Sequence, residues 1–281
     1  MTQYITPDLR RWLKEQLQSG VKATDLVISM TQAGWERKLA LQAVAELKID
    51  GWFGKKEETN PLAGKLPEPL VGDGRCLLDA GDREVSVLAT VQHPRVVVFG
   101  NLLSPEECRA IIDAATPRMQ RSETVSEKSV GSEVNVARTS RGMFFERAET
   151  DVIARVEARI ARLVNWPVEN GEGVQVLNYQ PGAEYQPHYD YFDARHASTE
   201  SILKRGGQRV GTLVMYLNTP KRGGATTFPD IKMAVQPIQG QAVFFSYATP
   251  DPSSLTLHGG APVLEGEKWV ATKWLRQGRF E

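Results

Sequence analysis

The feature that most constrains the fold is a series of short β-branched and aromatic runs in the second half of the chain, separated by turns rich in glycine and proline. They read GVQVLNYQ, AEYQPHYDYF, RVGTLVMYLN, AVQPI, QAVFFSYA and WVATKWLRQ. Two similar runs, EVSVLATV and RVVVFG, come earlier, and amphipathic helices are predicted at 104–115 and 150–164. Many short strands preceded by helices predict an α+β chain built on a β-sandwich or jelly roll with flanking helices.

The residues before this region predict a separate helical module at 1–48. Its first helix has Thr6 as N-cap and Pro7 at the first helical position. Residues 49–75 are rich in glycine, proline and charge, which predicts a linker or an extended wrap before the main domain at 76–281. Three short helices are compatible with a DNA-binding helix-turn-helix. However, seven Lys/Arg against six Asp/Glu in the first 50 residues supply no basic stripe, so we favour a module that docks a protein partner.

The composition argues against several classes of function. Hydrophobic residues make up 41% and charged residues 24%, as in globular proteins, and a formal net charge of zero predicts no general attraction to nucleic acid or to an anionic membrane. The N-terminus lacks the apolar core of a secretory signal, and no apolar run is long enough to span a bilayer. Cys76 and Cys108 are too few for a disulfide scaffold, so we expect reduced thiols in a cytoplasmic protein.

Two polar residues in the run YQPHYDYF suggest a metal site. In a strand, residues two apart point to the same face about 6.5 Å from each other, so His188 and Asp190 would converge on one ion while Tyr189 faces away. An HxD pair is common by chance and needs a third ligand. Of the other histidines, His93 has no partner pattern and His196 lies in a polar loop, whereas His258 lies before a glycine turn near the final strand.

Two histidines and one carboxylate form a facial triad that leaves three octahedral positions open. This arrangement suits Fe(II) that must bind both a cosubstrate and O2. A closed zinc site would need more cysteine or histidine ligands than this chain offers.

Lys268 follows His258 by ten residues, inside an apolar and aromatic strand. A buried ammonium is costly unless it meets an anion. A dicarboxylic cosubstrate fits, because its 2-oxo acid end would chelate the metal and its far carboxylate would pair with Lys268. The alternative is that Lys268 and Lys273 are ordinary strand residues facing solvent.

Several stretches, in this order, make residues 95–281 resemble the prolyl 4-hydroxylase branch of the Fe(II)/2-oxoglutarate dioxygenases. They are RVVVFGNLLSPEEC, RTSRGMFF, VLNYQPGAEYQPHYDYF, GGQRVGTLVMYLN, GGATTFP and LHGGAPVLEGEKWVATKW. The combination of H-x-D, a distal histidine and a lysine ten residues later is specific. The resemblance implies a double-stranded β-helix with the site at its open mouth.

The resemblance also implies roles for individual residues. His188, Asp190 and His258 match the iron ligands, and the intact carboxylate favours hydroxylation over halogenation. The other matched positions are Lys268 and Tyr179 for the distal carboxylate of 2-oxoglutarate, Thr226 for a further cosubstrate contact, and Tyr185, Arg209 and Trp274 for the peptide-substrate side. Core packing is the alternative for the aromatic residues, and we assign Trp269 to the core. A structural ion pair is the alternative for Arg209.

The implied activity is hydroxylation of a peptidyl proline, coupled to conversion of 2-oxoglutarate and O2 to succinate and CO2, with ascorbate as a candidate cofactor. The missing secretory signal and long peptide-binding region differ from collagen-modifying enzymes, so we expect a compact cytoplasmic enzyme of bacterial type. The polar segment 122–142 is either a lid that closes on a peptide or a disordered surface loop.

Two alternatives to this activity remain. The same chemistry could act on a free amino acid, a non-proline side chain or a small metabolite. A non-catalytic metal-binding or sensor protein could use the same barrel, although such a scaffold has no need of Lys268.

Overall fold

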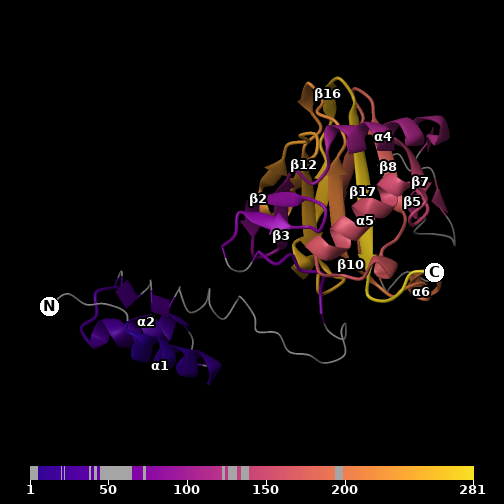
Figure 1. The fold of residues 1–281 in the computed structure, drawn as a ribbon. Coiled ribbons are helices and arrows are strands. Elements are labelled where there is room, and N and C mark those ends of the chain that lie inside the picture. The colour runs from indigo at the N-terminus through magenta and orange to yellow at the C-terminus, as the bar shows by residue number, and fades with distance from the viewer. Residues whose placement is uncertain are drawn as a thin grey trace. The chain divides into compact units, whose positions relative to one another are not determined.

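The chain forms two compact units, residues 1–59 and 60–281, in a computed structural model (Figure 1). The described residues are 6–19, 21, 23–37, 39–40, 43–44, 65–71, 74–121, 124–125, 132–133, 139–193 and 199–281. Within them, none of the helices combines the length and the apolar character that a bilayer crossing needs.

The first unit is helical and has its own small core. Helix α1 spans Pro7–Gln18 and begins as predicted, because the Thr6 side chain accepts a hydrogen bond from the backbone N–H of Leu9. Helix α2 spans Ala23–Gln32, and residues 37, 39–40 and 43–44 are also helical. The buried residues of this core are Leu13, Leu26, Met30, Ala40, Ala43 and Val44.

The second unit is built on a nine-stranded antiparallel sheet with the order β1-β2-β3-β14-β10-β17-β8-β7-β4. Its strands are β1 Leu77–Asp79, β2 Glu84–Val91, β3 Arg95–Gly100, β4 Gln120–Arg121, β7 Arg141–Phe145, β8 Val174–Tyr179, β10 Arg209–Tyr216, β14 Ala242–Ser246 and β17 Lys268–Arg276. Central strands β10 and β17 are buried on both faces, so the charged side chains of β17, among them Lys268 and Lys273, are buried as well.

Two helices cover one face of this sheet (Figure 1). Helix α4, Pro105–Ala115, has the predicted capping box: Ser104 accepts from the Glu107 N–H, and the Glu107 carboxylate accepts from the Ser104 N–H. Helix α5, Asp151–Leu163, is capped by Thr150. Ile111 of α4 and Ile153 of α5 pack against one face of the sheet. Both predicted helices are confirmed within one residue.

A four-stranded sheet with the order β13-β12-β15-β9 forms the second layer of the barrel. Its strands are β9 Tyr185–His188, β12 Thr226–Phe228, β13 Met233–Val235 and β15 His258–Gly260. Phe228 and Val235 of this sheet share a core with Val214, Tyr216 and Phe245 of the large sheet. The double-stranded β-helix is confirmed.

Smaller elements complete the unit. A two-stranded sheet joins β11 Arg222–Gly223 to β16 Val263–Glu265, another joins β5 Thr124–Val125 to β6 Ser132–Glu133, and the short helix α6 spans Thr199–Leu203. Three-residue 3-10 turns lie at Thr116–Arg118, Val168–Asn170, Pro229–Ile231 and Pro252–Ser254. The prediction of a lid at 122–142 falls mostly outside the described residues.

Residues 65–71, at the end of the segment predicted as a linker or wrap, lie along the second unit. The Glu68 N–H donates to the carbonyl of Val164 at 2.8 Å, and the Glu68 carboxylate pairs with Arg95. Leu66 and Val71 pack against the core beneath the helices. This part of the segment therefore belongs to the second unit.

Candidate active site

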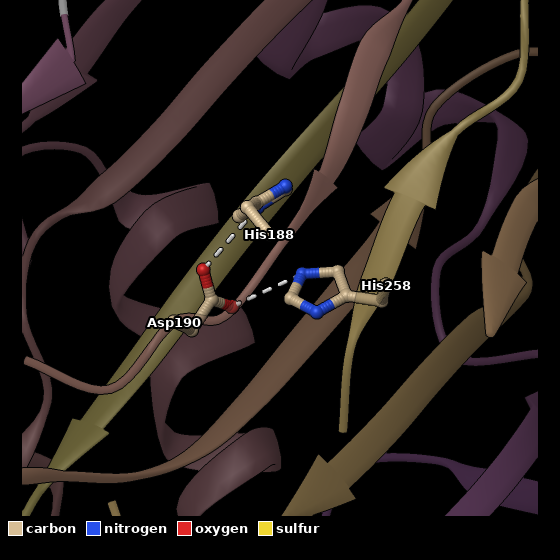
Figure 2. Close-up of side chains that lie close together, drawn as sticks. All are labelled: His188, Asp190 and His258. Carbon is tan, nitrogen blue, oxygen red and sulfur yellow. Dashed lines mark ion pairs between the residues drawn. The ribbon is translucent and has the colours of Figure 1, made fainter. Parts of the chain in front are cut away.

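The three predicted metal ligands meet between two neighbouring strands of the smaller sheet. His188 is the last residue of β9 and lies opposite His258, the first residue of β15. Nε2 of His188 lies 3.6 Å from Oδ1 of Asp190, and Nε2 of His258 lies 3.4 Å from Oδ2 (Figure 2). All the ligand atoms lie within 4.8 Å of one another, so the triad assembles as predicted.

One detail of the prediction is wrong. Asp190 is not on a strand, because β9 ends at His188 and Asp190 lies in a bend two residues later. His188 is the last residue of β9 with a partner in β15, so the ladder cannot extend to residue 190. The carboxylate reaches the histidines from a bend rather than from the face of a strand.

Backbone carbonyl groups orient both imidazoles. Nδ1 of His188 lies 2.9 Å from the carbonyl oxygen of Gln186, and Nδ1 of His258 lies 2.9 Å from that of Thr256. A carbonyl oxygen can only accept, so Nδ1 carries the proton in each ring. Nε2 is therefore the nitrogen available to a metal, and the carbonyl partners hold each ring in this orientation.

The electrostatics of the triad favour an ionised carboxylate. Burial would raise the pKa of Asp190, but His258 and His188 outweigh it and hold the pKa well below its usual value. Burial and the neighbouring His258 lower the pKa of His188. Burial would also lower the pKa of His258, but Asp190 outweighs it and raises that pKa, so His258 would give up a proton when a metal binds. An anionic oxygen and neutral imidazole nitrogens are the ligand set that a divalent first-row metal requires.

Lys268 lies in the same cavity as the triad. The cavity is lined by Tyr179, Tyr185, His188, Asp190, Val214, Thr226, His258, Gly259, Gly260, Lys268, Val270, Thr272 and Trp274. Lys268 is 3% exposed, and burial lowers the pKa of its ammonium to about 8. Among the described residues no carboxylate lies within ion-pair distance of Lys268. The alternative that Lys268 and Lys273 face solvent is wrong, because both are buried, and the role of Lys268 in binding the cosubstrate stays a prediction.

The other predicted cosubstrate residues are also in this cavity. Tyr179 pairs with Lys268 across strands β8 and β17, and the Lys268 ammonium lies 5.4 Å from the centre of its ring. Thr226 accepts a hydrogen bond of 2.9 Å from the hydroxyl of buried Tyr216. The Thr226 hydroxyl proton therefore remains available to an acceptor in the cavity.

The three predicted substrate residues differ in position. Tyr185 lines the cavity and stacks on His188 with 3.7 Å between ring centres. Trp274 also lines it, and its buried indole N–H has no hydrogen-bond partner in the described part of the chain. Arg209 is not a lining residue: its guanidinium pairs with Glu172 at 2.6 Å and lies 3.9 Å above the Trp274 ring. The structure therefore agrees with the alternative interpretation of Arg209 as a structural ion-pair partner.

The sequence gives no signal for two hydroxyl groups behind Asp190. Thr212 on β10 donates to Oδ2 of Asp190 at 2.8 Å, and the Tyr247 hydroxyl lies 3.1 Å from Oγ1 of Thr212. Threonine is common in β-strands, so its presence in an apolar run predicts only a strand. No sequence pattern distinguishes Thr212 as a residue that contacts the site.

Comparison with known proteins agrees with this geometry. Residues 174–276, which hold the triad and Lys268, match the 2OG-Fe(II) oxygenase superfamily. The chain is 41% identical over 266 residues to probable prolyl 4-hydroxylase 10 of Arabidopsis thaliana, covering 86% of this chain and 89% of that protein. It is 40% identical over 222 residues to prolyl 4-hydroxylase 5 of the same plant, covering 72% of this chain and 74% of the relative.

A solved structure agrees with these sequence matches. The viral collagen prolyl hydroxylase of Paramecium bursaria Chlorella virus-1, in its 2-oxoglutarate complex, superposes with a TM-score of 0.51 at 31% identity. The match covers 64% of this chain and 95% of the viral one. Fe(II), 2-oxoglutarate and O2 are the cofactor and cosubstrates of this superfamily, and the facial triad beside a buried lysine fits them. The chain belongs to the prolyl 4-hydroxylase family of Fe(II)- and 2-oxoglutarate-dependent dioxygenases.

Proposed function

We propose that this enzyme hydroxylates proline residues within a peptide or protein, at carbon 4 of the ring. The observation that carries the proposal is that the triad and Lys268, a buried ammonium without a carboxylate partner among the described residues, line one cavity. The relatives are named as prolyl 4-hydroxylases. Tyr185 and Trp274 add aromatic surface beside the triad, and such surface packs well against an apolar pyrrolidine ring.

The chain's residues have separable tasks in this reaction. When bound, Fe(II) with 2-oxoglutarate and O2 supplies the oxidation that places one oxygen atom on the proline ring and converts 2-oxoglutarate to succinate and CO2. His188, Asp190 and His258 would hold the metal through two imidazole nitrogens and one carboxylate oxygen. Lys268 would neutralise the distal carboxylate of 2-oxoglutarate, and Thr226 would donate a hydrogen bond to it.

The cavity walls would control what reaches the metal site. Val214, Val270 and Trp274 contribute apolar surface to its lining, which would strengthen the pairing between Lys268 and a carboxylate. Tyr185 stacks on His188 and so places its ring beside the point where a substrate would approach. The target C–H bond would thus be fixed between aromatic side chains and the metal ligands.

The direct test is a screen of proline-containing peptides and cell extract with Fe(II) and 2-oxoglutarate, with and without ascorbate. Mass spectrometry should find one added oxygen atom on proline, with equimolar succinate, and neither product with Asp190→Ala. Succinate formed with a free amino acid or a metabolite, but with no proline peptide, would move the assignment to that substrate. Absence of Fe(II)-dependent succinate with every substrate would favour a non-catalytic metal-binding protein.

We also propose that the N-terminal helices bind a protein partner and that the enzyme works in the cytoplasm. The first unit has its own core, and Trp12 and Ile28 are exposed on its helices at 43% and 55%. Both cysteines are free, as expected in a reducing compartment. Paired Trp12→Ser and Ile28→Ser changes should abolish co-purification of the partner without altering the KM for a peptide. Fractionation of the source cells tests the location.

A further inference from the structure

Asp190 is supported from behind by two buried hydroxyl groups. Thr212 is fully buried and Tyr247 is 3% exposed. The Thr212 hydroxyl donates to Oδ2 of Asp190 at 2.8 Å, and the Tyr247 hydroxyl lies 3.1 Å from Oγ1 of Thr212. Neither residue is among those that line the cavity, so their contact with the site passes through the carboxylate.

The hydrogen bonds of this pair have a fixed direction. A threonine hydroxyl has one proton, and here that proton goes to the carboxylate, which can only accept. The contact between Thr212 and Tyr247 must therefore use the tyrosine proton. Burial and the negative charge of Asp190 raise the pKa of Tyr247 well above its usual value, so the phenol keeps the proton that it donates. The hydrogen bonds therefore run from Tyr247 to Thr212 and from Thr212 to Asp190.

The two hydroxyls are attached to a rigid part of the molecule, whereas Asp190 is not. Thr212 is in the middle of β10, paired with Phe245 of β14 on one side and with Trp274 of β17 on the other. Tyr247 directly follows β14. Asp190 lies in a bend beyond the end of β9, where sheet hydrogen bonds no longer hold the backbone. The Asp190 carbonyl accepts one hydrogen bond of 3.3 Å from Arg209.

We propose that Thr212 and Tyr247 are positioning residues that fix the Asp190 carboxylate for binding the metal through one oxygen. Thr212 engages Oδ2 and leaves Oδ1 as the oxygen without a hydroxyl partner. Tyr247 acts through Thr212, because its proton keeps the threonine hydroxyl turned towards Asp190. This inference rests on the metal site of the proposed function but not on the identity of its substrate.

Metal binding without turnover tests the proposal. Anaerobic titration of the full chain with Co(II), followed by its visible absorption and by calorimetry, gives the affinity of the triad. Thr212→Val keeps the shape and removes the donor, and should weaken Co(II) binding by about 10- to 100-fold, as is typical for the loss of a partner that orients a ligand. Thr212→Ser keeps the hydroxyl and should bind Co(II) within about threefold of wild type.

The tyrosine provides a second and sharper comparison. Tyr247→Phe should weaken Co(II) binding by about three- to tenfold, and the double variant with Thr212→Val should bind no more weakly than Thr212→Val alone. Additive losses in the double variant would mean that the two residues act independently. That result would overturn the proposal that Tyr247 acts through Thr212. A matched control is Ser246→Ala, because this buried β14 hydroxyl has no hydrogen-bond partner within the described residues and its loss should leave Co(II) affinity unchanged.

The outcomes separate this inference from the proposed function. Thr212→Val with wild-type Co(II) affinity and an unchanged ligand-field spectrum would overturn the positioning role, even if the enzyme hydroxylates proline. Weakened binding in Thr212→Val with recovery in Thr212→Ser would support it, even if proline is not the substrate. Wild-type protein that binds no Co(II) would overturn the metal site and this inference together. Thermal unfolding of each variant identifies a loss that comes from misfolding.

Discussion

Two lysines on the last strand have nearly the same burial and different surroundings. Lys268 and Lys273 are five residues apart on β17, so they point to opposite faces of the large sheet, and they are 3% and 2% exposed. Lys273 donates to the Glu157 carboxylate of α5 and to the carbonyl of Glu172. Lys268 lies in the cavity, and in the described part of the chain its recorded partner is the face of the Tyr179 ring.

The difference separates a structural charge from a functional one. Burying an ammonium ion costs free energy, and a carboxylate partner within the fold offsets that cost for Lys273. At Lys268 burial alone acts, and it lowers the pKa to about 8. A fold keeps such a group where a ligand supplies the missing anion. The same contrast applies to Arg159, whose buried guanidinium is paired with Glu107 and Asp82 and does not line the cavity.

The largest expected effect on turnover comes from removing the metal ligands beside Lys268. Asp190→Ala or His258→Ala should lower turnover by at least about a thousandfold, because the metal carries the oxidation. Succinate release, measured with a proline peptide, follows this loss. Binding of 2-oxoglutarate to these variants in the presence of Fe(II) should also fall. A variant that keeps full turnover would mean that Lys268 serves another ligand.

Exchanging each lysine for methionine tests directly whether the two lysines have different roles. Lys268→Met should raise the Kd for 2-oxoglutarate by about 100-fold, because the distal carboxylate would face an uncharged side chain, while the melting temperature stays the same or rises. Lys273→Met should leave that Kd within about threefold and lower the free energy of unfolding by about 3 kcal/mol, since the buried Glu157 carboxylate then loses its cationic partner. Calorimetry and thermal unfolding measure the two effects.

The opposite pattern would reverse the assignments. If Lys273→Met weakened 2-oxoglutarate binding at unchanged stability, the lysine on the helix side would be the functional one. If both variants lost only stability, the unpaired state of Lys268 would have no functional meaning.

The sequence predicted the elements that local patterns determine. The β-branched runs became β2, β3, β8, β10 and β17, and the Ser104 capping box marks the start of α4. The spacing of His188, Asp190, His258 and Lys268, together with the family resemblance, predicts the cluster of ligands that the fold brings together. These signals work because strand alternation, helix capping and ligand types are readable over a few residues.

Contacts between distant residues could not be predicted in this way. The partner of Lys273 is 116 residues away on α5, and that of Arg209 is 37 residues away, so no local pattern links them. The alternating pattern predicts Asp190 on a strand, but the length of β9 depends on where β15 stops pairing with it. Burial of Lys273 likewise depends on helices that cover the sheet rather than on its own neighbours in the sequence.

The pH dependence of cosubstrate binding tests whether the charge of Lys268 is what binds 2-oxoglutarate. Since burial lowers the pKa of Lys268 to about 8, the ammonium is mostly protonated at pH 7 and mostly neutral at pH 9. Pairing with a carboxylate requires the protonated form. The Kd for 2-oxoglutarate should therefore rise by about tenfold between pH 7 and pH 9 in wild type. Lys268→Arg should remove this rise, because a guanidinium stays charged over that range.

Calorimetry over this pH range distinguishes Lys268 from the metal ligands. Affinity that falls towards low pH instead would indicate that protonation of the triad controls binding. An equal rise in Kd for Lys268→Arg would mean that another group titrates.

The smallest effect is expected from a neutral donor in the same cavity. Thr226 accepts from Tyr216 and has its own proton to donate, so Thr226→Val should remove one hydrogen bond to the cosubstrate and raise the Kd for 2-oxoglutarate by about fivefold. Thr227→Val is the matched control, because the next residue on β12 does not line the cavity. The Thr226 effect should be the same at pH 7 and pH 9, since a hydroxyl does not titrate in this range. A Thr226→Val loss as large as that of Lys268→Met would show that the carboxylate is held by neutral donors, and the unpaired ammonium would then need a different explanation.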